Sequence, residues 1–223
     1  MAGSLEVVIY GAGGHGRVVA DIIEQIGGCS IVGLVDDDPA LQGRCIGAYR
    51  VLGDRKVLRS LREGGVGRCI VAIGSNSVRG ELAALAKGLG LELMTVIHPG
   101  AHISPGATIG EGSVVEACSV VKTGSSVGRL AIINSCVSIG HDTVLAEGVH
   151  ISPGASIAGW VEIGEGTHIG MGASVIAGVK IGKNVVVGAN AAVIRDLPDN
   201  VVAVGVPARI ISERPVQASP DGG

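Results

Sequence analysis

The sequence predicts a two-part fold, a short α/β domain followed by a parallel β-helix that occupies the rest of the chain. A branched aliphatic residue stands at every sixth position from Ile97 to Val193, and a glycine often follows it. A helical period of 3.6 residues cannot keep every sixth residue on one face, and neither can strand alternation, whereas a hexapeptide repeat that coils the chain can. A strand, glycine loop, helix and strand over residues 5–38 predict the α/β domain.

Composition excludes several classes of protein. The 223 residues include 38 Gly, no Phe, one Trp and two Tyr, which suits a core of stacked aliphatic side chains. A net charge of −3 gives no sign of binding to nucleic acid or to a membrane surface. The five cysteines form no CxxC pair and are odd in number, which favours reduced thiols in a cytoplasm over disulfides or a metal site. We also see no signal peptide and no transmembrane helix, and expect a cytoplasmic protein.

The chain opens with a pattern that suits a nucleotide. Residues 5–10 read as a buried strand, the sequence GAGGHG covers residues 11–16, and residues 17–24 have helical spacing. A second strand over 31–35 ends in three aspartates at 36–38. Glycines let a ligand approach the backbone, the start of a helix offers free N–H groups to phosphate, and an aspartate can accept hydrogen bonds from a ribose or a base.

The same pattern leaves alternatives open. A tight turn without a ligand is one, and an NAD site is another. Only about 90 residues precede the repeats, however, and a full dinucleotide fold uses two mononucleotide halves. A third strand over 68–73 ends at Gly74, where ligands of open α/β sheets bind, and residues 78–88 read as a helix. We therefore expect this domain to hold one nucleotide.

The repeats define the second part of the fold. The repeated aliphatic residue is expected to point inward and fill the solenoid, and the small residue after it is expected to fit a corner where the backbone is crowded or needs positive φ. The seventeen inward positions are Ile97, Ile103, Ile109, Val115, Val121, Val127, Ile133, Ile139, Leu145, Ile151, Ile157, Ile163, Ile169, Val175, Ile181, Val187 and Val193.

These hexads resemble the left-handed β-helix of the hexapeptide-repeat acyltransferases, in which three hexads make one triangular coil. Together with the GAGGHG loop, the chain resembles the family of sialic acid O-acetyltransferases and nucleotide-linked amino-sugar N-acetyltransferases. The resemblance implies a Rossmann-like nucleotide-sugar-binding domain over residues 1–95, a left-handed β-helix acyltransferase domain over 96–212, and a flexible tail over 213–223. It also implies a homotrimer with the active site in the cleft between neighbouring subunits.

The resemblance further implies a catalytic segment. Residues 134–142 match the part of the family that carries the general base, which falls on His141, with Asp142 placed to orient or tune the ring. A neutral histidine can take a proton as an amine attacks a thioester. Residues 18 apart should stack in such a solenoid, so Gly159 should lie one coil from His141. The family uses the backbone N–H of the matching glycine to hold the thioester carbonyl.

The remaining site residues also follow from the family match. Substrate-binding positions fall on Gly13, Gly14, His15, Asp36, Asp37, Gly74 and Asn134. Positions that contact acetyl-CoA fall on His150, Gly159, Met171 and Ala189, the last often a glycine in the family. No metal is expected.

Three functions remain open at this point. The first is acetyl transfer from acetyl-CoA to the 4-amino group of a nucleotide-linked 4-amino-4,6-dideoxy sugar, with GDP-perosamine as the first candidate and a UDP-linked amino sugar as the second. The second is O-acetylation of sialic acid or a related sugar with the same fold and base. The third is a non-catalytic solenoid that binds a nucleotide-sugar without turnover.

Overall fold

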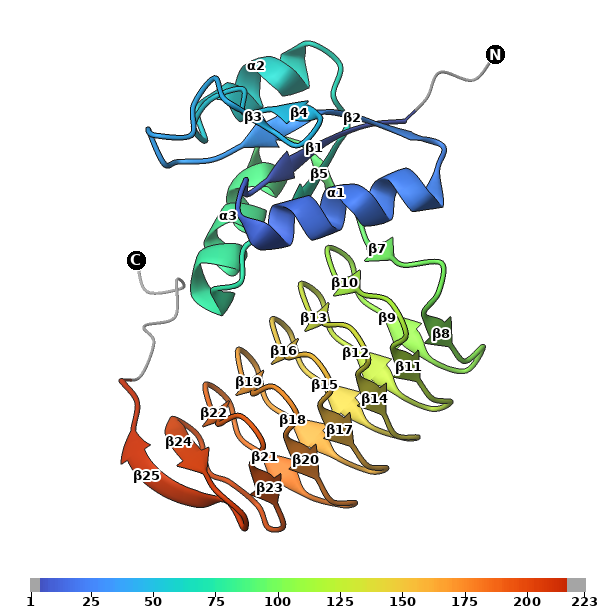
Figure 1. The fold of residues 1–223 in the computed structure, drawn as a ribbon, viewed down its shortest axis with the longest axis vertical. Helices are drawn as coiled ribbons and strands as arrows, with labels where there is room; N and C mark the ends of the chain where they lie inside the picture. The colour runs from blue at the N-terminus through green and yellow to red at the C-terminus, as the bar shows by residue number, and fades with distance from the viewer. Residues whose placement is uncertain (1–4, 216–223) are drawn as a thin grey trace.

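A computed structural model of the chain describes residues 5–215, with a small α/β domain seated on one end and one side of a solenoid (Figure 1). Both expected parts of the fold are present. Of the tail expected over 213–223, residues 216–223 lie outside the described part, and Glu213 ends the last strand.

The α/β domain is built on a four-stranded parallel sheet in the order β2-β1-β5-β6. Its strands are β1 (Leu5–Tyr10), β2 (Cys29–Val35), β5 (Arg68–Val71) and β6 (Glu92–Leu93), and its helices are α1 (Gly14–Ile26), α2 (Val57–Glu63) and α3 (Asn76–Gly88). The expected strand over 68–73 is thus two residues shorter. The sequence pattern did not predict α2 or the hairpin of β3 (Cys45–Ile46) and β4 (Tyr49–Arg50).

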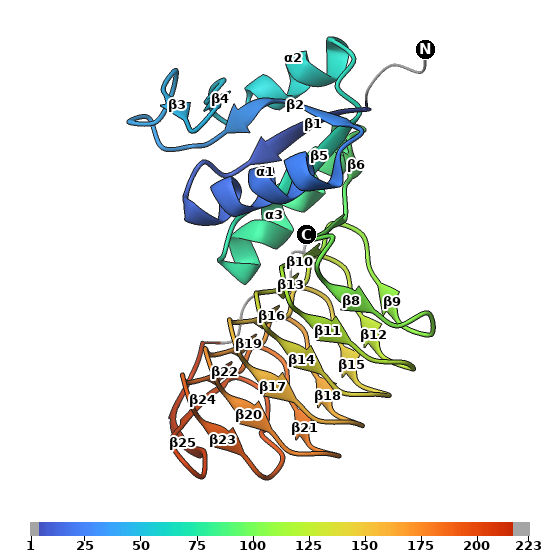
Figure 2. The same ribbon diagram turned by 45° about the vertical axis from the view of Figure 1, so that its right-hand side comes forward.

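Two apolar clusters join this domain to the solenoid. Helix α1 covers one face of the sheet, and its cluster continues into Val96 and Val114 of the first coils. Helices α2 and α3 cover the other face, and their cluster takes in Leu130 from the solenoid. In Figures 1 and 2, α1 and α3 lie on the side of the α/β domain that is nearest the coils, whereas α2 lies on the far side of that domain.

The solenoid has three faces, each a ladder of parallel two-residue strands, to which the longer β24 and β25 add at the end of one face (Figure 2). The eight-strand face contains β7 (Val96–Ile97), β10 (Val114–Val115), β13 (Ile132–Ile133), β16 (His150–Ile151), β19 (His168–Ile169), β22 (Val186–Val187), β24 (Val201–Val204) and the antiparallel β25 (Arg209–Glu213). The six-strand face contains β8 (His102–Ile103), β11 (Val120–Val121), β14 (Ser138–Ile139), β17 (Ser156–Ile157), β20 (Ser174–Val175) and β23 (Ala192–Val193). The five-strand face contains β9 (Thr108–Ile109), β12 (Ser126–Val127), β15 (Val144–Leu145), β18 (Glu162–Ile163) and β21 (Lys180–Ile181).

The second residue of each two-residue strand is the repeated aliphatic residue, and it points into the prism as predicted. Positions from Val115 to Val193 are buried in one continuous cluster, with Ile97, Ile103 and Ile109 half-buried at its open end. Buried hydroxyls lie at the corners without loss of hydrogen bonding. Thr143, for example, donates to Ala158 O at 2.9 Å and accepts from Val161 N at 3.4 Å.

Two positions of the repeat need glycine for two different reasons. The glycine directly after the inward residue, such as Gly128 or Gly164, touches the backbone of the next coil, and an added Cβ would fall 2.5–2.7 Å from it. Positive φ occurs two residues later, at every sixth position from Gly112 to Asn190. Crowding therefore explains the glycines noted in the sequence, and the left-handed turn belongs to another position.

Buried Arg79 fastens α3 to the solenoid. Its side chain is 1% exposed, and it donates from Nε to Leu130 O at 2.8 Å and from Nη2 to Gly148 O at 2.9 Å. Neighbouring Asn76 donates to Gly166 O at 2.7 Å, so three successive coils are held. Burial lowers the pKa of Arg79 to about 10, which leaves it charged at neutral pH. Arg79 and Asn76 therefore set where the glycine-bearing end of the sheet sits over the coils.

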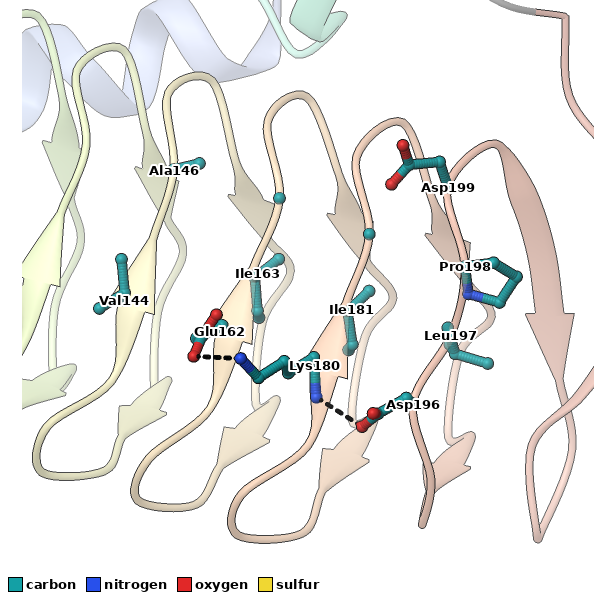
Figure 3. A pocket seen from close by; sticks show the side chains of 12 residues that line it. Val144, Ala146, Glu162, Ile163, Lys180, Ile181, Asp196, Leu197, Pro198 and Asp199 are labelled. Carbon is teal, nitrogen blue, oxygen red and sulfur yellow. Dashed lines mark hydrogen bonds and ion pairs between the residues drawn. The ribbon is translucent and has the colours of Figure 1, made fainter.

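The three faces differ in what they present outward. The α/β domain covers part of the eight-strand face. The five-strand face carries an ion pair near its end: Lys180 Nζ lies 2.9 Å from Glu162, and Lys180 N donates to Asp196 at 2.8 Å, beside a groove that Val144, Ile163 and Leu197 also line (Figure 3). The six-strand face is flat in its last four strands, whose outward residues are Ser138, Ser156, Ser174 and Ala192.

Candidate active site

His141 lies at the corner that joins the six-strand face to the five-strand face, between β14 and β15. Its Nδ1 is 2.9 Å from Asp142 Oδ2, in an ion pair whose partners are 41% and 51% exposed. Asp142 occupies the left-handed position of the repeat with φ 55°, and its carboxylate lies over Gly124 of the preceding coil. If Nδ1 carries the proton toward the carboxylate, Nε2 keeps a lone pair that can accept another proton.

Gly159 lies one coil from His141, as the 18-residue spacing predicts. A Cβ added to Gly159 would fall 2.7 Å from Cε1 and 2.8 Å from Nε2 of the imidazole, so the ring rests directly on the glycine. Any larger residue would push the ring away. Among the described residues, the Gly159 N–H has no hydrogen-bond acceptor. A base and an unpaired backbone donor thus share one corner, which is the arrangement that acyl transfer requires.

Sequence reasoning did not single out Trp160, yet it completes this corner. Its ring meets the imidazole of His141 edge to face, with centroids 4.5 Å apart and planes at 90°. Trp160 also donates its backbone N–H to His141 O at 3.0 Å. A signal did exist, because tryptophan stands at the left-handed position of the repeat, where glycine is the commonest residue.

A second polar cluster lies under the α/β domain, on the eight-strand face and the corner that leads to the six-strand face. Asn134 Nδ2 lies 2.7 Å from His150 Nε2, and Ser152 Oγ lies 2.7 Å from His168 Nε2. The two imidazoles stack with centroids 4.5 Å apart. Burial, then the nearby charges of His168 and Arg79, lower the pKa of His150 to about 3. His150 is therefore neutral at pH 7.

The glycine loop reaches this second cluster through His15. Its Nδ1 is 3.6 Å from Glu116 Oε1, and the other oxygen of buried Glu116 accepts from Ser135 N at 3.2 Å. The structure thereby brings His15 and Asn134 to the same strip of the solenoid. Gly74 is at the end of β5, and its carbonyl accepts from Arg79 at 3.4 Å.

The glycines of the loop fall into two groups. An added Cβ would clash at Gly11 with the Ala72 carbonyl and at Gly16 with the Gly11 carbonyl, so these two serve packing. Gly13 and Gly14 are exposed, have no atom within 4 Å of an added Cβ, and do not have positive φ. Nothing inside the subunit requires glycine there, and α1 starts without a side-chain cap. Close approach by a ligand accounts for both facts.

The two aspartates after β2 make bonds within the domain. Asp36 accepts from Ala12 N at 2.8 Å and from Asp38 N at 2.9 Å, so it ties the end of β2 to the glycine loop. Asp37 pairs with Arg55, whose Nη2 lies 2.6 Å away. Burial raises the pKa of Asp37, but hydrogen bonds, chiefly from Arg55, outweigh burial and hold it below the usual value. Both carboxylates keep lone pairs free for a ligand.

Met171 and Ala189 lie one coil apart on the same corner as Asn134, and both are exposed. No contact in the described part of the chain links this corner to His141, which stands at the other edge of the six-strand face. One subunit therefore carries two separate halves of a candidate site.

Residues 5–215 contain no candidate metal site, since no group of three or more His, Cys, Asp or Glu side chains there could hold a metal ion. None of the helices in that range has the length and apolarity needed to cross a membrane.

Comparison with known proteins agrees with this layout. Residues 6–85 match the PglD N-terminal domain family, and residues 94–123, 142–175 and 161–195 match the bacterial transferase hexapeptide family. A UDP-N-acetylbacillosamine N-acetyltransferase of Bacillus subtilis is 39% identical over 119 residues, which span 50% of this chain and about half, 51%, of that enzyme.

Solved structures match over almost the whole chain. PerB from Caulobacter crescentus, in complex with CoA and GDP-perosamine, has a TM-score of 0.89 at 42% identity over 95% of this chain and 99% of that one. A histidine-to-asparagine variant of perosamine N-acetyltransferase from the same organism, also with both ligands, gives 0.90 and 41% over 96% and 99%. The acetyltransferase domain of PglB from Neisseria gonorrhoeae, with acetyl coenzyme A, gives 0.87 and 38% over 94% and 100%.

Proposed function

Since the chain belongs to the family of nucleotide-sugar amino N-acetyltransferases that join a PglD N-terminal domain to hexapeptide repeats, we propose that it transfers an acetyl group from acetyl-CoA to the 4-amino group of a nucleotide-linked 4-amino-4,6-dideoxy sugar. GDP-perosamine is the first candidate substrate, because PerB is similar over the whole chain, and a UDP-linked amino sugar is the second. We place the reaction in the cytoplasm, in the synthesis of a surface glycan such as a lipopolysaccharide O-antigen.

The observation that carries this proposal is the His141 corner. The amine nitrogen attacks the thioester carbon, the carbonyl oxygen gains negative charge, and the N–H of Gly159 stabilises that charge. His141 Nε2 takes the proton that the nitrogen must lose, while Asp142, 2.9 Å from Nδ1, holds the ring and stabilises the imidazolium. The C–S bond then breaks, and the thiol of CoA leaves with the proton.

The glycine loop supplies the nucleotide end of the site. The exposed Gly13 and Gly14 let the diphosphate approach the first N–H groups of α1, and Asp36 accepts from the ribose or the base. His15 pairs with Glu116, which lies on the same strip of the solenoid as Asn134. The sugar therefore extends from the glycine loop past His15 toward Asn134. Asn134 contacts the sugar, and the acetyl-CoA runs past His150, Met171 and Ala189.

These two halves meet if the six-strand faces pack around a three-fold axis. The ion pair of Lys180 and Glu162 on the five-strand face suits solvent, and the eight-strand face carries the α/β domain. The flat six-strand face lies between the His141 corner and the Asn134 corner, so packing it would bring one subunit's His141 to its neighbour's Asn134. Such a heterologous contact closes into a ring, and we assign a homotrimer.

The substrate assignment is tested by incubating the protein with acetyl-CoA and a panel of GDP-, UDP- and CMP-linked sugars while free thiol is followed. We expect thiol release with a nucleotide-linked 4-amino sugar, and a product that keeps its acetyl group in mild alkali, because amides survive where esters hydrolyse. Loss of the acetyl group in alkali would establish O-acetylation instead. Binding of a sugar without thiol release would support the non-catalytic alternative.

A matched pair of glycine variants tests the nucleotide loop. Gly13→Val places a side chain in open space, so stability should be unchanged while the affinity for the nucleotide-sugar falls, by at least about tenfold when a phosphate hydrogen bond is blocked. Gly16→Ala should instead lower the melting temperature, because its Cβ meets the Gly11 carbonyl. Calorimetry measures the affinity of each variant for the nucleotide-sugar, for acetyl-CoA and for NADH. Full affinity in Gly13→Val, or tight NADH binding alone, would refute the assignment.

A second matched pair tests the assembly. Ser156 on β17 and Ser126 on β12 are both exposed serines that point outward, one on the six-strand face and one on the five-strand face. Ser156→Arg should dissociate the trimer and abolish activity, because a buried unpaired charge is strongly unfavourable at an interface. Ser126→Arg should leave both unchanged. Sedimentation that shows an active monomer at micromolar concentration would rule out the shared site.

His141→Asn tests the base. The substitution keeps size and polarity, so the trimer should stay intact and bind both substrates, while kcat falls by about 10²–10⁴-fold with little change in KM. The matched control is His98→Asn, a histidine outside both halves of the site, which should retain wild-type kcat. An intact His141→Asn trimer with wild-type kcat from pH 6 to pH 9 would show that the proton leaves by another route.

A further inference from the structure

Trp160 is a bulky apolar residue in a backbone position that disfavours it. Its φ is 56°, and the same position of the other repeats holds either glycine or one of Cys118, Leu130, Cys136, Asp142, Asn184 and Asn190, none of them as large as tryptophan. A side chain with a Cβ is strained in this region, asparagine least among them. The backbone therefore gives no reason for a tryptophan at this place.

Packing inside the subunit gives no reason either. Leu130 is the other large apolar residue at this position of the repeat, and it is 3% exposed in the cluster beneath α3. Trp160 is 62% exposed, so most of its ring lies outside the core. A strained and exposed residue of this size needs another partner, and the ring it meets in the structure is the imidazole of His141.

The indole completes a three-sided enclosure of the His141 ring. Gly159 lies beneath the ring, Asp142 holds Nδ1 at 2.9 Å, and Trp160 meets it edge to face with centroids 4.5 Å apart. A single hydrogen bond to the carboxylate still allows the imidazole to rock about the Cα–Cβ and Cβ–Cγ bonds of His141. The indole opposes that rotation, because the edge-to-face arrangement of two aromatic rings is itself favourable.

We infer that Trp160 is a positioning residue for His141: it holds the imidazole so that Nε2 faces the space beside the Gly159 N–H. This inference rests on the proposed role of His141 as the base. Trp160 acts through the histidine and takes no proton itself. The assignment adds a third requirement to the corner, an aromatic side chain at the left-handed position next to the oxyanion donor.

The chain offers a direct probe, since Trp160 is its only tryptophan. A protonated imidazole that touches an indole quenches its fluorescence. We expect emission of the wild-type protein to fall on acidification, and the fall to vanish in His141→Asn. His98→Asn should retain it. A titration that persists in His141→Asn would overturn the pairing of the two rings, whatever the activity of that variant.

Kinetics test what the pairing does. Trp160→Asn suits the left-handed backbone, and it should lower kcat by between about twofold and about tenfold, the range of an aromatic pair, with KM for both substrates unchanged. Trp160→Phe should restore most of the activity. In the His141→Asn background, Trp160→Asn should have no further effect.

Three results would overturn the inference. They are wild-type kcat in Trp160→Asn, an equal decrease of kcat when His141 is already absent, and dissociation of the assembly by sedimentation, which would make Trp160 an interface residue. Each differs from failure of the proposed base, which would appear as a fully active His141→Asn whose tryptophan emission no longer changes with pH.

Discussion

Successive coils of the solenoid are joined by backbone hydrogen bonds, and in all but the last coil each residue therefore meets the residue eighteen positions further along. This closeness leaves no room for a Cβ at the residue after the inward one, which is why glycine recurs there. It also places His141 on Gly159 and His150 on His168. A slip of one residue between the two members of a pair would separate them, so the candidate site depends on the register of the coils that carry it.

The α/β domain is held on this ladder by a charged side chain that is buried between the two. Arg79 is buried, and backbone carbonyls from both domains surround its guanidinium. Burying a charge is unfavourable unless every donor has a partner, so the position of α3 over the coils is narrowly fixed. Since Gly74 and the glycine loop are at the same end of the sheet, a fixed α3 also fixes the nucleotide end relative to Asn134.

Two residues with a left-handed backbone contact the proposed base. Asp142 and Trp160 both occupy the left-handed position of the repeat, in neighbouring coils, and both contact His141. Glycine or asparagine would suit this position better and stands there in other coils. Strained residues persist when their side chains are needed, and both of these side chains contact the same imidazole. Leu130 occupies the same left-handed position for a different reason, because its side chain packs between the α/β domain and the solenoid.

The inward ladder could be predicted from the repeat pattern, because a period of six suits a coiled parallel β-helix and neither an α-helix nor an alternating strand. The stacking of His141 on Gly159 also needed the coil of three hexads that the family resemblance implied. The glycine loop could also be recognised in the sequence, because residues 11–16 follow directly on a predicted strand. The pattern did not reveal that Gly13 and Gly14 lie open while Gly11 and Gly16 serve packing.

The contacts between the two domains, and between the rings of His141 and Trp160, became visible only in the tertiary structure. Arg79 lies on the apolar stripe of α3 with Leu82 and Ala86, but a charge on such a stripe gains meaning only from carbonyls distant in sequence. Trp160 likewise acquired a partner only when the coil brought its ring against His141. A periodic sequence pattern predicts contacts between residues at a fixed spacing. Arg79 contacts the coils, and Asp37 contacts Arg55, at sequence spacings that follow no period, so only the tertiary structure defines these pairs.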